Sequence, residues 1–231
     1  MGLRFELSKL ANPERARLLQ GFFKTGKGEY AEGDIFLGIS VPETRRIAKK
    51  FSQLSLAELQ KNLESKYHEE RLAALLILEE KFRKSPKAER KRIFEFYLEN
   101  AQFVNNWDLV DLTAPKILGE FLVDKDRKIL YALAKSRNLW ERRIAVLSTL
   151  AFIRRKEFED SLKIARILLS DSQDLIHKAV GWMLREVGKK DKKALLDFLK
   201  ENHNLMPRTM LRYSIEKFPE KERKELLAGK V

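Results

Sequence analysis

The chain has 231 residues, and 44% of them are hydrophobic, which is enough to build one continuous core. Its 47 Lys and Arg outnumber its 34 Asp and Glu and give a formal net charge of +13. This charge favours nucleic acid, an anionic membrane or an acidic protein as partner. The lack of Cys excludes disulfides, thiolate zinc sites and a cysteine nucleophile. The three His lack metal-ligand spacing, and no apolar run approaches the roughly 20 residues of a membrane span, so we expect a cytoplasmic protein without a bound metal.

The N-terminal segment Met1–Glu6 lacks the apolar run of a signal peptide. The glycine-rich stretch 25–34 lacks the GxxxxGK[ST] order of a phosphate loop, so we interpret it as a connector between helices. The tandem carboxylates Glu69-Glu70 and Glu79-Glu80 are typical of exposed helix charges.

Apolar residues recur at helical spacing along the whole chain, with few signals for strands or hairpins. Leu72, Leu75 and Leu76 begin one such apolar stripe, and Ile144 and Leu147 belong to another. The pattern predicts an all-α fold.

The helical pattern also repeats. The segment 71–78 resembles 143–150 and 177–184, and 208–215 is a weaker copy. A missing copy would begin at Trp107. A period of roughly 30 to 40 residues in a helical chain predicts stacked helical hairpins, the HEAT-like solenoid, which we expect to form a single domain over residues 1–231.

In a solenoid, equivalent positions of successive repeats line up. The leading positions are Arg71, Trp107, Arg143, His177 and Arg208. On a concave face this row would form a basic track for a phosphate backbone with an aromatic contact surface. The alternative is that these are helix-entry residues with solvated charges.

The segment that begins at Trp107 holds the best candidates for chemistry. Trp107 and Asp111 are four residues apart and share one helix face. Asp108 faces elsewhere, and a first-turn capping role suits it. Trp182 could approach the same groove or be a buried structural residue, and His177 and Lys178 are better suited to phosphate or solvent than to catalysis.

Three segments resemble signatures of the AlkD family of bacterial DNA alkylation-repair glycosylases. They are Asn106-Trp107-Asp108-Leu109-Val110-Asp111, Leu139-Trp140-Glu141-Arg142-Arg143-Ile144-Ala145 and Lys178-Ala179-Val180-Gly181-Trp182-Met183-Leu184-Arg185-Glu186. The segment 36–45 is similar to the family's FLGI-x-x-P-x-x-R element and ends at Arg45. The resemblance spans about residues 10 to 218.

The resemblance implies a right-handed solenoid with a concave basic face and an enzyme that hydrolyses the N-glycosidic bond of cationic N3- or N7-alkylated purines in double-stranded DNA. It implies a catalytic carboxylate at Asp111, indoles at Trp107 and Trp182, and an arginine beside the DNA backbone at Arg143. No cofactor is implied. We expect a nucleoid-associated monomer in which the other DNA-binding residues are Arg71, His177, Lys178, Arg208 and Arg45.

One departure from the family concerns a Tyr on its N-terminal helix, where this chain offers Phe22 and Phe23. An aromatic wall is kept, but the phenol is lost. Because an N3- or N7-alkylated purine is already a cationic leaving group, the enzyme needs only to stabilise an oxocarbenium-like sugar, which Asp111 and the two indoles could do. The resemblance implies that the base stays stacked during the reaction.

Two other functions remain open. A HEAT-repeat protein that binds damaged or branched DNA without catalysis would show salt-sensitive binding and no base release. A scaffold that grips an acidic peptide would fail to bind duplex DNA at low salt.

Overall fold

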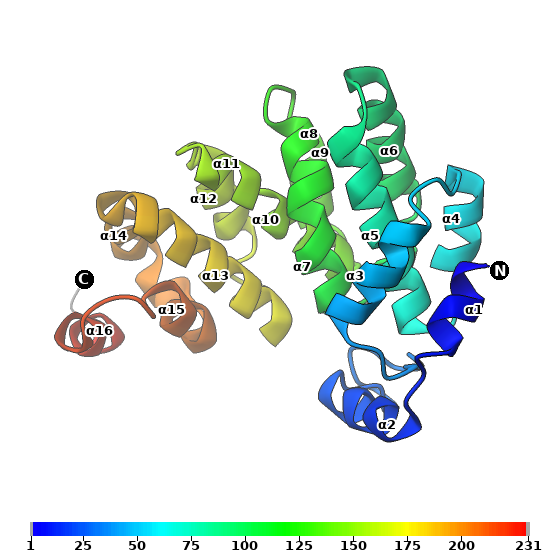
Figure 1. Ribbon diagram of the computed structural model, residues 1–231. Coiled ribbons are helices and arrows are strands. Elements are labelled where there is room, and N and C mark those ends of the chain that lie inside the picture. Colours follow the sequence, from blue (N-terminus) through cyan, green and yellow to red (C-terminus); the bar gives the residue numbers. More distant parts are fainter. Residues whose placement is uncertain (1, 230–231) are drawn as a thin grey trace. The chain divides into compact units, whose positions relative to one another are not determined.

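The computed structural model describes residues 2–229, so residues 1, 230 and 231 of the predicted single domain lie outside the described part. Within it, the secondary structure is helical, and the only strand-type pairing is one isolated bridge between Ile35 and Tyr67 (Figure 1). The all-α prediction is confirmed. No helix in the described range combines the length and the apolar character that crossing a membrane requires.

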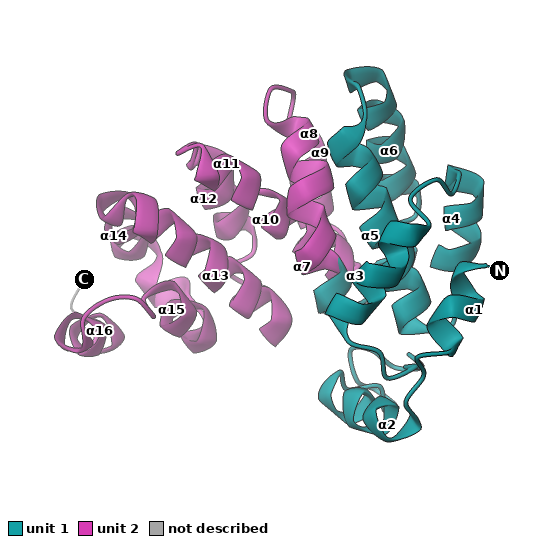
Figure 2. Ribbon diagram, viewed as in Figure 1, with its two compact units in different colours: residues 1–109 teal, residues 110–231 magenta. Residues whose placement is uncertain are grey.

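The chain divides into two compact units, residues 1–109 and 110–231 (Figure 2). We call them unit 1 and unit 2. The boundary falls within helix α7 (Trp107–Ala114), so Trp107 belongs to unit 1 and Asp111 to unit 2.

Unit 1 is built around one long buried helix, α5. Residues 68–78 of α5 are all buried, because α3, α4 and α6 pack around it and leave its first three turns no solvent-facing side. The complete helices of unit 1 are α1 (Leu3–Ser8), α2 (Pro13–Phe22), α3 (Val41–Lys50), α4 (Leu56–Leu63), α5 (His68–Lys84), α6 (Lys87–Glu99) and the 3-10 turn η1 (Ala101–Phe103).

Unit 2 alternates longer helices with shorter ones, and α13 is the helix on which the others converge, with α10, α14 and α15 against it. After α7, its elements are the π-helical turn η2 (Pro115–Gly119), α8 (Glu120–Leu122), α9 (Lys128–Ala134), α10 (Leu139–Ser148), α11 (Leu150–Arg154), α12 (Glu159–Ile167), α13 (Asp174–Lys190), α14 (Lys192–Asn202), the 3-10 turn η3 (His203–Leu205), α15 (Arg208–Ser214) and α16 (Glu220–Leu227).

Each of the five sequence copies begins inside a helix, but not at the same place in it. Trp107 and Arg208 are the first residues of α7 and α15, whereas Arg71 and His177 are fourth and Arg143 is fifth in their helices. Positions one, four and five share a helix face but lie one turn apart. The row of leading residues is therefore not a line of equivalent positions.

The prediction that Glu69 and Glu70 are exposed helix charges is wrong. Glu69 is 1% exposed, and its carboxylate accepts hydrogen bonds from the backbone N–H groups of Leu37, Gly38 and Ile39 at 2.8, 2.8 and 3.1 Å. Glu70 is 5% exposed and pairs with Arg4 at 3.1 Å. The first turn of α5 faces protein, so Glu69 binds a loop and Glu70 pairs with Arg4 of α1 instead of meeting water.

The loop held by Glu69 depends on Gly38. Its φ of +84° lies in the left-handed region, and a Cβ there would stand 2.2 Å from the carbonyl oxygen of Asn12. Gly38 therefore allows this loop to pass directly over the start of α2. It is the glycine of the segment that resembles FLGI-x-x-P-x-x-R. Ser40 then caps α3 together with Glu43 in a capping box.

We expect Gly181→Ala to destabilise the protein by about 1–3 kcal/mol, because overpacking of a close helix contact forces the backbones apart. A Cβ at this position of α13 would lie 2.5 Å from Tyr213 Cβ and 2.6 Å from the carbonyl oxygen of Met210 on α15. Denaturant unfolding measures the change. The control is Gly21→Ala in α2, where no atom lies within 4 Å and alanine should be neutral or stabilising. Equal effects of the two substitutions would contradict the packing argument.

Candidate functional site

Trp107, at the start of α7, is the outer member of an aromatic stack in unit 1. Its indole stacks on Phe23 with a centroid separation of 5.0 Å, Phe23 stacks on Phe36 at 4.9 Å, and Phe36 stacks on His68 at 4.4 Å. Phe23 and Phe36 are buried, while Trp107 is half-buried. The stack holds the indole from beneath and leaves part of it open to solvent.

The two residues at the place of the family Tyr have different positions. Phe23 is 7% exposed and lies under the indole, whereas Phe22 is 65% exposed and meets Trp107 edge-to-face at 6.0 Å. An exposed ring beside a half-buried indole is unusual for a structural residue, because burial of Phe is strongly favoured. Phe22 and Trp107 therefore present an apolar aromatic surface at the end of α2.

Beneath the stack, His68 lies between two buried carboxylates. Its Nδ1 is 3.1 Å from Asp34 Oδ2 and its Nε2 is 2.8 Å from Asp108 Oδ2. Burial by itself lowers the pKa of His68, but the charges and hydrogen bonds of Asp108 and Asp34 outweigh it and raise this pKa to about 9. At neutral pH the ring is an imidazolium that donates to both carboxylates.

Asp34 is the centre of this polar cluster. Besides His68, its carboxylate accepts hydrogen bonds from the Arg71 guanidinium and from Asn106 Nδ2, the latter at 3.1 Å. Burial raises the pKa of Asp34, but the hydrogen bond from His68 and the charge of Arg71 more than compensate, and the pKa is lowered. The connector that contributes Asp34 thus anchors the start of α5 and the start of α7 to each other.

Arg71, which we expected to contact DNA, is 4% exposed. Its guanidinium donates to Asp34 and, at 2.9 Å, to the carbonyl oxygen of Ser65. A guanidinium buried and paired in this way holds the fold of unit 1 and does not face a phosphate. The prediction of solvated charge at the leading positions is equally wrong for this residue.

In unit 2, Asp111 and Arg143 form a two-pronged ion pair. Arg143 Nε and Nη2 donate to the two oxygens of Asp111, each at 2.8 Å, and Arg143 Nη1 donates to the carbonyl oxygen of Leu175 on α13. Both residues occupy the fifth position of their helices, α7 and α10. Arg143 is nearly buried, but the side chain of Asp111 keeps 16% of its surface exposed. A planar guanidinium thus fixes the orientation of a carboxylate whose side chain is still partly exposed.

Trp182 is half-buried on α13 and lines a hollow of about 330 Å³. Its Nε1 donates to Glu186 Oε1 at 3.2 Å, one turn further along the same helix. The hollow is bounded by Leu150, Ile153, Arg154, Trp182, Glu186 and Lys190. Trp182 is therefore not a sealed core residue, and Glu186 fixes its orientation.

The remaining DNA-binding candidates lie nearer the surface and have intramolecular partners. Lys178 pairs with Asp174 at 2.7 Å and Arg45 pairs with Glu79 at 3.3 Å. His177 contacts the backbone oxygen of Asp171, and Arg208 that of Leu227, each at 2.5 Å. Of these contacts, Lys178 with Asp174 is an ion pair between two largely exposed side chains, which is weak enough to exchange for a phosphate.

Sequence reasoning missed the cluster around His68, because its partners stand 34 and 40 residues away along the chain. It also missed Glu186 as the partner of Trp182, although their spacing of four residues on a helix is a usable signal. In the range 2–229, no group of three or more His, Asp and Glu side chains is arranged to hold a metal ion.

Comparisons with known proteins bear on the family and the fold of the chain. A family model described as DNA alkylation repair enzyme matches residues 3–218. A solved structure described as a predicted DNA alkylation repair enzyme from Enterococcus faecalis superimposes with a TM-score of 0.69 at 18% sequence identity, covering 91% of this chain and 97% of that one. That likeness is one of fold. Among curated protein sequences, none matches the chain.

We expect the imidazolium of His68 to make stability depend on pH. Since its folded-state pKa of about 9 is above the unfolded value of 6.5, its contribution is complete below pH 6.5 and is lost as the pH rises through 9. Denaturant unfolding at pH 6.5, 7.5 and 9 should show a progressive fall in wild type. His68→Gln should be less stable at pH 6.5 and should lack this fall, whereas the control His203→Gln should retain it. A pH profile of His68→Gln parallel to wild type would refute the assignment.

Proposed function

The chain belongs to the DNA alkylation repair enzyme family, and from that premise we propose that it is a DNA glycosylase that hydrolyses the N-glycosidic bond of cationic N3- or N7-alkylated purines. The observation that carries the proposal is the geometry of Asp111. Its carboxylate is held by Arg143 through two hydrogen bonds of 2.8 Å, and its side chain keeps 16% of its surface exposed. A fixed negative charge on a partly exposed side chain is suited to meeting a positive charge that develops on a substrate.

The proposed reaction needs no general acid from the protein. An alkylated purine leaves as a neutral base, so no acid is required to protonate it. The bond breaks as the deoxyribose becomes oxocarbenium-like, and a preorganised carboxylate lowers the energy of that state. We assign this role to Asp111, together with the positioning of the attacking water. Arg143 prevents the carboxylate from turning away. It is 5% exposed and all three of its nitrogens donate within the protein, so, like Arg71, it does not face a phosphate, and the expected contact with the DNA backbone is not supported.

The two indoles would contact the sugar and the backbone. Trp107 and Trp182 are each half-buried and each held by defined partners, Phe23 beneath the first and Glu186 beside the second. Their π faces favour a cationic sugar by the attraction that gives cation–π contacts about 0.5–2 kcal/mol. Phe22 would extend the aromatic surface beside Trp107 without the hydrogen bond of a phenol.

We propose that the base stays in the duplex. A flipped purine is normally gripped between aromatic or apolar side chains in a closely fitting pocket. The hollow at Trp182 offers a single aromatic ring, and Arg154, Glu186 and Lys190 contribute charged groups to its walls. Recognition by the charge of the lesion would tolerate large alkyl groups and exclude neutral lesions such as uracil.

The decisive experiment compares wild type with Asp111→Asn on duplex DNA containing 7-methylguanine, with free base as the readout. The substitution keeps the shape and removes the charge, so we expect base release to fall by about 100-fold or more. Equal release by both proteins would remove Asp111 from the mechanism.

Asp111→Asn also weakens a buried ion pair, so the control variant must weaken a similar buried ion pair away from the proposed site. Asp171→Asn is matched to it, because Asp171 accepts from Arg142 at 2.6 Å in the same unit and is itself nearly buried. We expect comparable losses of unfolding free energy in the two variants, but a loss of base release only in Asp111→Asn. Equal loss of release in both would indicate that the ion pair at Asp111 is structural.

One observation favours a second function, the binding of damaged or branched DNA without catalysis. Both oxygens of Asp111 already accept from Arg143, which partly neutralises the charge that would face the sugar. In that case wild type would bind DNA in a salt-sensitive manner, would release no base from 7-methylguanine or 3-methyladenine, and would bind as well after Asp111→Asn.

A further inference from the structure

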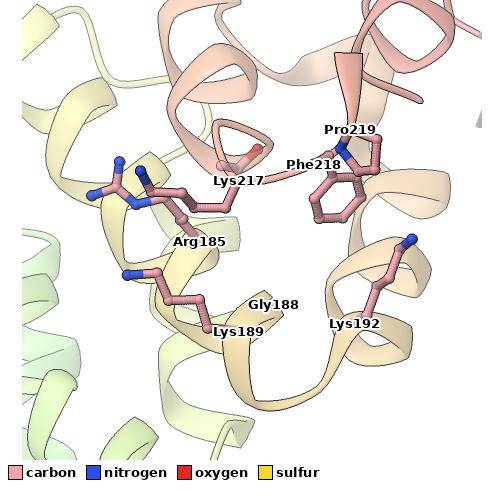
Figure 3. Close-up of a pocket in the computed structure, with 8 residues that line it drawn as sticks. Arg185, Gly188, Lys189, Lys192, Lys217, Phe218 and Pro219 are labelled. Atoms are coloured by element: carbon pink, nitrogen blue, oxygen red, sulfur yellow. The ribbon is translucent and has the colours of Figure 1, made fainter. Parts of the chain in front are cut away.

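A second hollow, of about 200 Å³, lies in unit 2 on the side of α13 that faces α14 and α15 (Figure 3). Its lining residues are Arg185, Gly188, Lys189, Lys192, Ser214, Lys217, Phe218 and Pro219. Four of these eight are cationic, and none is acidic. They come from three places in the chain: the second half of α13, the first residue of α14, and the last residue of α15 with the turn that follows it. We call this hollow the cationic pocket.

The arrangement of the cations suggests a shared anion. Arg185, Lys189 and Lys217 extend side by side toward one side of the pocket, while Lys192 stands on the other side next to the Phe218 ring (Figure 3). Lys192 Nζ lies 5.0 Å from the centroid of that ring. Like charges gathered this closely repel each other unless an anion lies among them.

In the structure, carboxylates supply that anion: Lys189 pairs with Glu186 at 2.7 Å and Lys192 with Glu222 at 2.8 Å. Glu216 binds both Arg185 and Lys217, the latter at 3.0 Å. The hydrogen bond from Lys217 and the charge of Arg185 lower the pKa of Glu216, so it is ionised at neutral pH. Its side chain is nevertheless 43% exposed, and exposed ion pairs of this kind are weak. Glu216 is therefore a replaceable partner.

The pairing also leaves a donor unused. Arg185 Nε is buried and makes no hydrogen bond, and its nearest carboxylate oxygen, Glu186 Oε1, is 3.8 Å away. A buried N–H without an acceptor is costly, and a guanidinium binds a tetrahedral oxyanion through two donors at once. Phosphate therefore suits this arginine better than the carboxylates of Glu216 and Glu186 that now reach it.

We propose that the cationic pocket binds a backbone phosphate of nucleic acid, which displaces Glu216 from Arg185 and Lys217. Lys189 adds a third contact, and Lys192 at the opposite wall adds long-range attraction. The inference rests on the proposal that DNA is the partner of this chain, and it identifies one place where the backbone is held.

The position of the pocket relates it to Trp182. Arg185 and Lys189 follow Trp182 by three and seven residues on α13, which is about 4.5 and 10.5 Å along the helix axis. Glu186 accepts from Trp182 Nε1 at 3.2 Å and from Lys189 at 2.7 Å. A phosphate in the pocket thus lies within about three turns of α13 from Trp182. It would fix the register of the strand there.

The test measures the affinity for an undamaged duplex as a function of salt. For every phosphate that the protein no longer neutralises, the slope of log K against log salt becomes shallower by about 0.9. We expect a change of up to about 0.9 for Lys189→Ala/Lys217→Ala, since the pocket holds one phosphate that both cations share. The matched control is Lys193→Ala, because Lys193 neighbours Lys192 and pairs with Asp197 at 2.6 Å but does not line the pocket. An equal slope for the control and the double variant would overturn the proposal.

Removing the carboxylate of Glu216, which competes with phosphate, should raise the affinity for duplex DNA. We expect Glu216→Gln to bind duplex several-fold more tightly than Asp197→Asn, which makes the same change of charge outside the pocket. Weaker or equal binding would overturn the displacement by phosphate.

Inorganic phosphate distinguishes a nucleic-acid phosphate from a free one. We expect it to shift the backbone amide signals of Gly188 and Ser214 only weakly at millimolar concentration and to compete with duplex. Tight binding of inorganic phosphate, with the salt slope for DNA unchanged in the double variant, would make the pocket a site for a free oxyanion and contradict the proposal.

The design separates this inference from the glycosylase proposal, because binding to undamaged duplex requires no cleavage. If wild type releases no base but the slopes differ as expected, the pocket stands and the catalytic proposal fails. If base is released but the salt slope of the double variant equals that of the control, the phosphate-site proposal is contradicted and the glycosylase proposal is not.

Discussion

A charge that a helix brings into the protein interior must find an opposite charge there, and this constraint organises both units. In unit 1, the imidazolium of His68 is held between Asp34 and Asp108, and Arg71 completes the cluster. In unit 2, Arg143 binds Asp111. Breaking a buried pair leaves an uncompensated charge, which costs more than the pair itself contributes. The first turns of α5, α7 and α10 are therefore fixed in place by electrostatics as well as by apolar packing.

The same pairing prepares the groups that we assign to function. Phe36, which stacks on His68, supports Phe23, and Phe23 supports the indole of Trp107. On the other indole, Glu186 sets the orientation of Trp182. Each of these side chains loses little freedom when a substrate binds, because its conformation is already determined, and preorganisation of this kind is what an electrostatic catalyst requires. In the proposed reaction, the partly exposed side chain of Asp111 supplies the negative charge.

The basic residues of the chain divide into two classes that composition does not distinguish. Arg71 and Arg143 are interior residues whose guanidinium groups satisfy carboxylates and backbone oxygens. Others, such as Lys189 and Lys217, form exposed and replaceable pairs around a hollow. Only the second class can exchange its partner for a phosphate at small cost, so the net charge of +13 overstates the number of cations free to meet DNA.

The sequence by itself determined the helices, because apolar spacing and capping are local properties, and it determined that Trp107 and Asp111 share a face, because four residues make about one turn. Resemblance between motifs identified the family, which the match over residues 3–218 established. Only the tertiary structure decided which charges are buried. Glu69 looked exposed on its own helix, but it is enclosed by a loop some 30 residues earlier in the chain. Burial depends on what packs against a helix, and no local pattern carries that information.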